Sequence, residues 1–137
     1  MKTFGLDITS ADIIDTLSFF DSWDDRYRYI IDLGKELPPM ADAEHTDANL
    51  IRGCQSKVWL SSESREGRLY FNVDSDAFIV KGLLAIVMAA YNTKTPAEIR
   101  SFDIQGFFES IDLMRHLSPT RGSGLQAMVA RIQSIAA

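Results

Sequence analysis

The chain has 137 residues, of which 46% are hydrophobic and 24% charged, as expected of one domain built around a single core. Nineteen acidic and fourteen basic residues give a formal charge of −5, so binding to the phosphates of nucleic acid is not expected. The single cysteine, Cys54, excludes an intramolecular disulfide and any zinc site or cluster that needs several thiolates from one chain.

No targeting or membrane segment is predicted. The N-terminal residues lack the apolar run of a secretion signal, and the longest apolar stretch, Leu83–Tyr91, is too short to span a bilayer. We therefore expect a cytoplasmic protein with a reduced thiol and no membrane association. The sequence contains no repeat, low-complexity tract or flexible linker, so we expect a single domain over residues 1–137.

Two helices are predicted in the first third of the chain. Ser10 is a suitable N-cap for a helix that ends near Asp21. A second helix is predicted over residues 24–33, with Gly34 as its C-cap and the following Pro38-Pro39 preventing its continuation. Residues 40–49 are polar and acidic without periodicity, which indicates an irregular surface loop.

Three short antiparallel strands are predicted next, at Leu50–Ile51, Val58–Leu60 and Leu69–Val73. Residues 64–67 are suited to a hairpin turn between the last two strands. Cys54 would then lie in the tight connection between the first two strands, presented from a rigid frame.

The remaining residues are predicted to be helical. Residues 77–91 are apolar on almost every face, which indicates a helix buried against the sheet. A capping-box pattern at 95–98 opens a short helix, and residues 107–114 form another. Ser118-Pro119 opens a final helix, whose beginning Gly122 and Gly124 would keep flexible. The fold class expected is α+β, with a small three-stranded antiparallel sheet packed against several helices.

The surroundings of Cys54 favour reactivity over a purely structural role as a small buried hydrophobic residue. Arg52 and Lys57 flank it with no anion between them, so we expect a stabilised thiolate. Gly53 allows close approach of a partner to the backbone.

Three kinds of thiol chemistry remain open at this point. A cysteine hydrolase would need His45 or His116 as its base, and no spacing rule ties either to Cys54. Peroxide or disulfide reduction usually needs a second, resolving cysteine. Transfer of sulfur through a persulfide needs one cysteine only.

Five ordered blocks of the sequence resemble the SufE family of sulfur-acceptor proteins, which includes CsdE. The resemblance covers nearly the whole chain, and it departs from the usual family pattern at Gly122-Ser123. The blocks are Gly53–Leu60, Asp74–Leu83, Thr95–Ile99, Leu117–Arg121 with Gly124-Leu125, and upstream Trp23, Arg26-Tyr27, Leu33-Gly34 and Leu37-Pro38.

The resemblance implies an accessory sulfur-transfer protein and not an enzyme. Family members take sulfur from the persulfide of a pyridoxal-phosphate-dependent cysteine desulfurase of the SufS or CsdA kind, stimulate that enzyme, and deliver the sulfur to a SufBCD-like scaffold or another acceptor. The pyridoxal phosphate belongs to the desulfurase, so no bound cofactor or metal is expected here. The implied fold resembles that of IscU, and an IscU-like iron–sulfur scaffold is the alternative function.

The resemblance also assigns site residues by position. Cys54 matches the persulfide-forming cysteine. Asp76 and Arg121 match positions linked to the cysteine loop or to docking, although Asp76 could instead cap the helix that follows it. The neighbours expected to contribute to docking or loop movement are Arg52, Gly53, Gln55 and Lys57, with Glu109 and His116 as weaker candidates.

Overall fold

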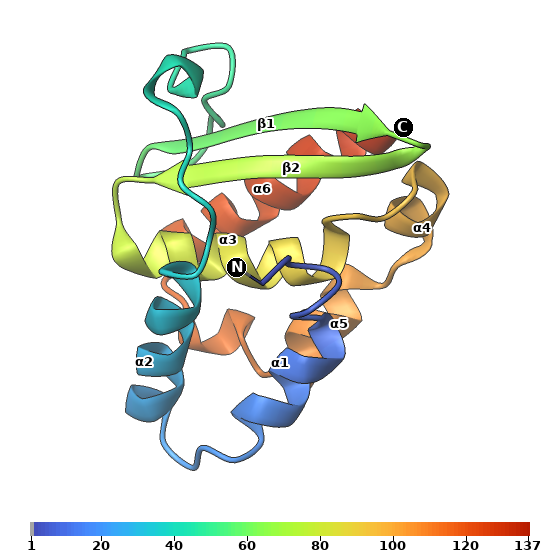
Figure 1. Cartoon of the computed structure of the whole chain (residues 1–137). Coiled ribbons are helices and arrows are strands. Elements are labelled where there is room, and N and C mark those ends of the chain that lie inside the picture. Colours follow the sequence, from blue (N-terminus) through green and yellow to red (C-terminus); the bar gives the residue numbers. More distant parts are fainter. Residues whose placement is uncertain (1) are drawn as a thin grey trace.

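The computed structural model describes residues 2–137, which form a two-stranded sheet packed on a group of helices (Figure 1). The central helix α3 (Phe78–Tyr91) lies under the sheet, with α1 (Ser10–Leu17) and α2 (Trp23–Gly34) on one side of it and α6 (Pro119–Ala136) behind (Figure 1). The α+β class predicted from the sequence is therefore confirmed, as is the packing of an antiparallel sheet on helices.

The first two helices form where they were predicted, with shifted ends. Thr9 caps α1 through a reciprocal pair of bonds with Asp12, so the N-cap is one residue earlier than the predicted Ser10. This helix ends at Leu17, well before Asp21. Gly34 is the last residue of α2 and not its C-cap.

Gly34 has a packing role. A Cβ atom there would lie 2.6 Å from the backbone nitrogen of Gly82, so the absence of a side chain lets α2 and α3 pack with their backbones in close contact.

The sheet has two strands and not the three predicted. Strands β1 (Val58–Arg65) and β2 (Arg68–Ser75) form an antiparallel hairpin with Leu60 opposite Val73. The predicted turn is confirmed at Glu66 and Gly67, both with positive φ.

The predicted first strand is reduced to one bridge between Leu50 and Trp59. Ile51 donates to the carbonyl of Val58, and Asn49 accepts from the amide of Leu60. The chain then leaves the sheet edge, so this pairing is too short to make a third strand.

Helix α3 provides the centre of the core. Every residue from Gly82 to Tyr91 is buried, as the nearly continuous apolar sequence predicts. Side chains from the other helices and both strands join it in one hydrophobic cluster. Because α3 is buried from Gly82 to its end, it provides a rigid support for the elements packed around it.

The C-terminal elements differ in detail from the prediction. The capping box at 95–98 is confirmed at the start of α4 (Pro96–Ser101). The helix predicted over 107–114 is instead α5 (Ile104–Ser110), which Asp103 caps. Two short 3-10 helices complete the chain, η1 (Asp42–Glu44) and η2 (Met114–His116).

Ser118 caps α6, as predicted, but its early glycines are not flexible. Gly122 and Gly124 are helical and buried. Their lack of side chains serves packing, because Gly122 faces Met114 and Gly124 faces Cys54.

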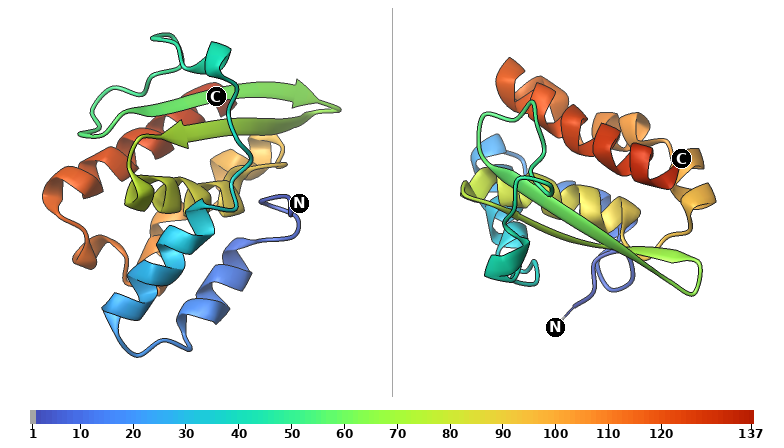
Figure 2. Two further views of the ribbon diagram at one scale, coloured as in Figure 1. Left: turned by 60° about the vertical axis from the view of Figure 1, so that its left-hand side comes forward. Right: turned by 90° about the horizontal axis from the view of Figure 1, so that it is seen from above.

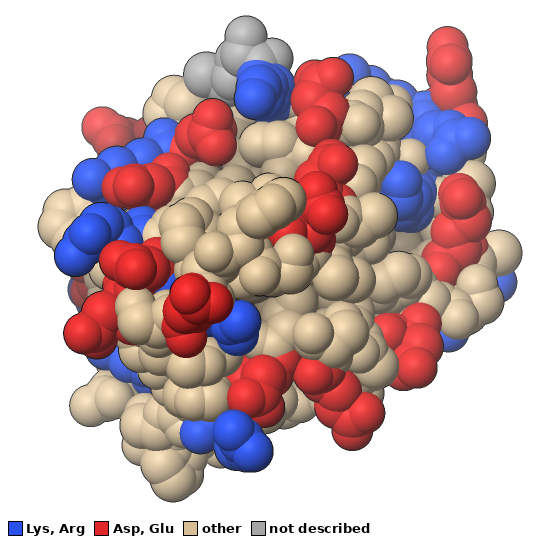
Figure 3. Space-filling model, turned by 90° about the horizontal axis from the view of Figure 1, so that it is seen from below, with Lys and Arg blue, Asp and Glu red and all other residues tan. Residues whose placement is uncertain are grey.

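Charge is unevenly distributed along the chain. Residues 1–50 contain eleven acidic and four basic residues. Seen from below, acidic side chains border a broad uncharged area of the surface (Figure 3).

Within the described residues, no helix has both the length and the apolar character needed to cross a membrane.

Candidate functional site

Cys54 lies in a loop that is anchored at both ends and free between them. Arg52 and Gly53 form a turn, and the backbone of residues 52–56 is not paired with β1, β2 or α6. The chain on either side is held, since Ile51 donates to Val58 and Lys57 bonds to Ser75 and Asp76. Both views in Figure 2 show this segment beside α6. The hydrogen bonds on both sides therefore bracket the five residues around the thiol.

Gly53 provides the turn that this loop requires. Its φ of +89° lies in the region that residues with a side chain rarely adopt. A side chain there would also face Ala127 of α6. Gly53 therefore lets the chain turn so that Cys54 points towards α6.

The sulfur of Cys54 is half-buried against the first turns of α6. The thiol donates to the carbonyl of Gly124, with 3.6 Å between sulfur and oxygen. Beside it is a cavity of about 20 Å³. A space of this size holds one water-sized group. It is lined by Cys54, Gln55, Ser56, Val80, Leu83, Thr120, Arg121, Gly124 and Met128.

Burial raises the pKa of the Cys54 thiol above its ordinary value. The stabilised thiolate expected from Arg52 and Lys57 is therefore wrong for the folded chain. Both of those side chains are exposed, where water screens their charge, whereas the sulfur itself is desolvated. Burial therefore favours the protonated, weakly nucleophilic thiol over the thiolate in the folded chain.

Asp76 fastens the C-terminal end of the loop. Its carboxylate accepts a hydrogen bond from the amide of Lys57 at 3.1 Å, and its own amide donates to the Lys57 carbonyl. The alternative role as a helix cap is wrong, because the N-cap of α3 is Ala77 and has no side-chain cap bond.

The buried Ser75 makes the same anchor stronger. Its hydroxyl donates to the Lys57 carbonyl at 2.7 Å and accepts from the amide of Ala77. The loop end is thus tied to the first turn of α3.

The other predicted residues differ in whether they line the cavity beside Cys54. Arg121 comes from the first turn of α6 and lines the cavity together with Cys54 and Gln55. Arg52 and Gln55 are exposed on the loop. Glu109 lies exposed near the end of α5, outside the cavity lining.

Neither histidine contacts Cys54 within the described residues. His116 stacks on Trp23, with ring centroids 3.9 Å apart, and its Nδ1 bonds to the Asp112 carbonyl. His45 lies on the outer face of the sheet, where its Nε2 is 2.6 Å from the carboxylate of Asp74. The geometry therefore gives no support to a Cys–His hydrolase.

The contact between His45 and Asp74 shifts the pKa of both side chains. The hydrogen bond that His45 donates to the carboxylate of Asp74 raises the pKa of His45. Burial alone would raise the pKa of Asp74, but bonds from His45, from the Ser75 amide and from Lys81 together hold it below the usual range. The pair joins the loop before Cys54 to the end of β2.

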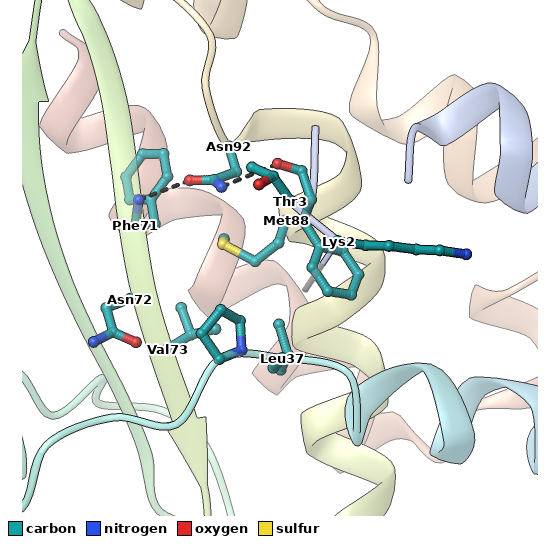
Figure 4. Close-up of a pocket in the computed structure, with 10 residues that line it drawn as sticks. Lys2, Thr3, Leu37, Phe71, Asn72, Val73, Met88 and Asn92 are labelled. Carbon is teal, nitrogen blue, oxygen red and sulfur yellow. Dashed lines mark hydrogen bonds between the residues drawn. The ribbon is translucent and has the colours of Figure 1, made fainter. Parts of the chain in front are cut away.

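A second cavity, of about 130 Å³, lies between the N-terminal segment, β2 and the end of α3 (Figure 4). Asn92 closes one side of it by accepting from the amide of Phe71 and donating to the carbonyl of Phe4 (Figure 4). None of the predicted site residues lines it. Among residues 2–137, no group of three metal-binding side chains gathers anywhere.

Several residues of the Cys54 site were not predicted. Val80, Leu83 and Met128 read in the sequence as core residues of amphipathic or buried helices, so nothing separates them from other apolar positions. Gly124 was expected to keep the start of α6 flexible and belongs to one of the family-like blocks, but its contact with Cys54 was not predicted. Ser75 lies directly before Asp76. The sequence does not show that Ser75 is buried, and its role at the loop end depends on that burial.

Comparison with known proteins identifies the family to which the chain belongs. The family model SufE, described as an Fe-S metabolism associated domain, matches residues 11–136. An uncharacterized SufE-like protein of Rhizobium meliloti is 45% identical over 132 residues, covering 93% of this chain and 94% of its own. Another, from Rhizobium etli, is 46% identical over 125 residues, covering 88% of this chain and 84% of its own.

A solved structure shares the fold. The solution structure of a hypothetical protein from Thermus thermophilus has a TM-score of 0.75 and 16% identity, and the match covers 93% of this chain and 92% of that one. The family match and the curated relatives cover most of the chain. The chain therefore belongs to the SufE family of proteins of iron–sulfur metabolism.

Proposed function

We propose that this chain is a sulfur acceptor that takes persulfide sulfur from a cysteine desulfurase onto Cys54, stimulates that enzyme, and passes the sulfur to an iron–sulfur assembly scaffold. It would work as one domain, in the cytoplasm, without a cofactor of its own. The observation that carries the proposal is the position of the only cysteine, on a loop that is anchored at both ends and whose backbone is not paired with the sheet or the helices.

The transfer needs no external oxidant or reductant. The Cys54 thiolate attacks the outer sulfur of the donor cysteine persulfide, forming a new sulfur–sulfur bond. The bond between the two donor sulfurs breaks, and the donor cysteine leaves as a thiolate that takes up the proton released by Cys54. One sulfur atom has then moved between chains with no net redox change.

The cavity beside Cys54 suits storage of the product. Its volume of about 20 Å³ adjoins the sulfur and is lined partly by Val80, Leu83 and Met128. One additional sulfur atom is of the size that such a space accepts. Enclosed there, the persulfide is shielded from the oxidation that exposed low-pKa sulfur undergoes.

Movement of the loop would link this storage state to reaction. A buried thiol cannot reach the active site of another protein, so residues 52–56 must turn outward when the desulfurase docks. The outward position returns the sulfur to water, which lowers its pKa towards the ordinary value and increases the thiolate fraction. Reactivity is thereby restricted to the complex.

The basic side chains near the loop have a separate role. Arg52 and Lys57 are exposed, and Arg121 lies at the cavity. We assign them to docking, because exposed charges contribute mainly to the rate and orientation of encounter. They would match acidic residues around the desulfurase active site.

The proposal is tested by desulfurase turnover on free cysteine, measured with and without the chain. Cys54→Ser must abolish stimulation, while the exposed hairpin variant Ser62→Ala must stimulate as the wild type does. Equal stimulation by Cys54→Ser would refute the sulfur-acceptor role. Anaerobic reconstitution that gives a stable cluster absorbance on the isolated chain would instead support the IscU-like scaffold.

A further inference from the structure

The chain segment that carries Cys54 lies along one face of α6. Gly124, Ala127, Met128 and Arg131 lie at spacings that share a helix face. Gly124 accepts from the Cys54 thiol, and Ala127 is the neighbour of Gly53. The segment therefore runs antiparallel to α6, from Arg131 back to the cavity.

Arg131 holds the beginning of this segment. Its Nη2 donates to the carbonyl of Ala48 at 2.8 Å, and its Nη1 lies 3.5 Å from the carbonyl of Leu50. A guanidinium with two donors pointing the same way is well suited to hold two nearby carbonyls of one loop segment. In the sequence, Arg131 is more than eighty residues away from both Ala48 and Leu50.

The cavity and this anchor lie on the same helix. Gly124 and Arg131 are separated by two turns of α6, a rise of about 10 Å. Because α6 is rigid over that length, fixing Ala48 and Leu50 to Arg131 sets where the five-residue loop starts relative to the cavity. The distance that residues 52–56 must span is then defined by the helix.

We infer that Arg131 is a positioning residue, which fixes the root of the loop on α6 and so holds the Cys54 sulfur at its cavity. Its role is independent of charge at the sulfur, since the guanidinium bonds backbone carbonyls and not the thiol. The purpose of this placement rests on the proposed sulfur-acceptor function, but the placement itself is a property of the free chain.

The test is the rate at which iodoacetamide alkylates Cys54 in the free chain, without a desulfurase. Arg131→Met keeps the apolar stem of the side chain and removes the donors. It should be alkylated about tenfold faster than the wild type, as expected when a charge-assisted hydrogen bond is lost. Arg131→Lys, which keeps one donor group at this place, should lie between the two.

Arg100→Met is the matched control, because Arg100 also donates to a helix-end carbonyl, that of Ala136, away from the loop. It should be alkylated at the wild-type rate. Hydrogen exchange separates local opening from unfolding: in Arg131→Met, the amides of Ile51 and Leu60, which bond across the root of the loop, should exchange faster while those of α3 keep their protection. Wild-type alkylation of Arg131→Met, or equal acceleration in Arg100→Met, would overturn the inference.

Failure of this test and failure of the sulfur-acceptor proposal are distinguishable. The alkylation assay contains neither persulfide nor partner, so its outcome bears on positioning alone. A chain that passes it yet never accepts sulfur would keep the Arg131 contact and lose the proposed function.

Discussion

Replacing Gly82 by Ala should separate α2 from α3 and lower stability. A Cβ on Gly82 would lie 2.4 Å from the carbonyl oxygen of Ile30 and 2.6 Å from its Cγ2. Real Cβ contacts essentially never fall below 3.0 Å, so the helices must part by at least 0.6 Å at this point. The nearest clashing atom is backbone, so a change of side-chain rotamer cannot relieve it.

The expected loss can be estimated from two opposing effects. Overpacking a well-packed core costs about 1–3 kcal/mol, and a backbone clash belongs at the upper end. Alanine in place of glycine within a helix returns about 1 kcal/mol. The free energy of unfolding should therefore fall by about 2 kcal/mol. For a chain of 137 residues, an unfolding entropy of about 2.1 cal/mol/K per residue converts this to a fall in Tm of about 7 °C.

Thermal unfolding followed by circular dichroism measures this change. Gly122→Ala is the control, because its Cβ would meet only the flexible end of Met114 at 3.2 Å. That variant should unfold at or above the wild-type temperature. An unchanged Tm for Gly82→Ala, or an equal loss in Gly122→Ala, would show that close backbone packing of α2 on α3 is not what fixes α3.

Three further predictions concern the loop and its surroundings. Asp76→Ala removes the acceptor for the Lys57 amide and should speed alkylation of Cys54 several-fold, whereas Asp76→Asn, which keeps an acceptor oxygen, should stay near the wild-type rate. Because burial raises the pKa of Cys54, the alkylation rate of the native chain should rise with pH through a higher midpoint than that of the chain in denaturant; equal midpoints would contradict this. The hydrogen bond with Asp74 raises the pKa of His45, so its stabilisation is complete below the unfolded histidine pKa of about 6.5 and is lost as pH rises through the folded-state value. The difference in Tm between wild type and His45→Gln should shrink over that interval, and a constant difference would refute the pairing.

Local signals in the sequence predicted the helices well. The capping box at Thr95 and the apolar run of α3 depend on neighbouring residues only, and both were confirmed. The N-cap of α1 was predicted one residue too late, because Thr9 precedes the apolar pattern from which the helix was predicted.

The errors came from contacts between distant parts of the chain. Leu50 and Ile51 have the composition of a strand, but the chain leaves the sheet edge after one bridge and Cys54 packs against Gly124 of α6. The thiolate prediction counted the charges of Arg52 and Lys57 and could not include burial against Gly124, seventy residues further on.

The sequence context singles out Cys54 as the candidate sulfur-accepting residue, but it does not show the structure that holds this side chain. Ser75 and Arg131 look like an ordinary strand residue and an ordinary helix surface residue. Only the fold shows that their polar groups bond to the backbone on either side of the loop. Such anchors have no signature in a single sequence, because they act on backbone groups that every residue shares.

The measurement that tests the central claim most directly is the intact mass of the chain after incubation with a cysteine desulfurase and free cysteine. The sulfur-acceptor account predicts an added mass of one or more sulfur atoms that disappears on treatment with a reductant. Because Cys54 is the only cysteine, Cys54→Ser must show no such addition. A wild-type chain that gains no sulfur while the desulfurase turns over would contradict the account.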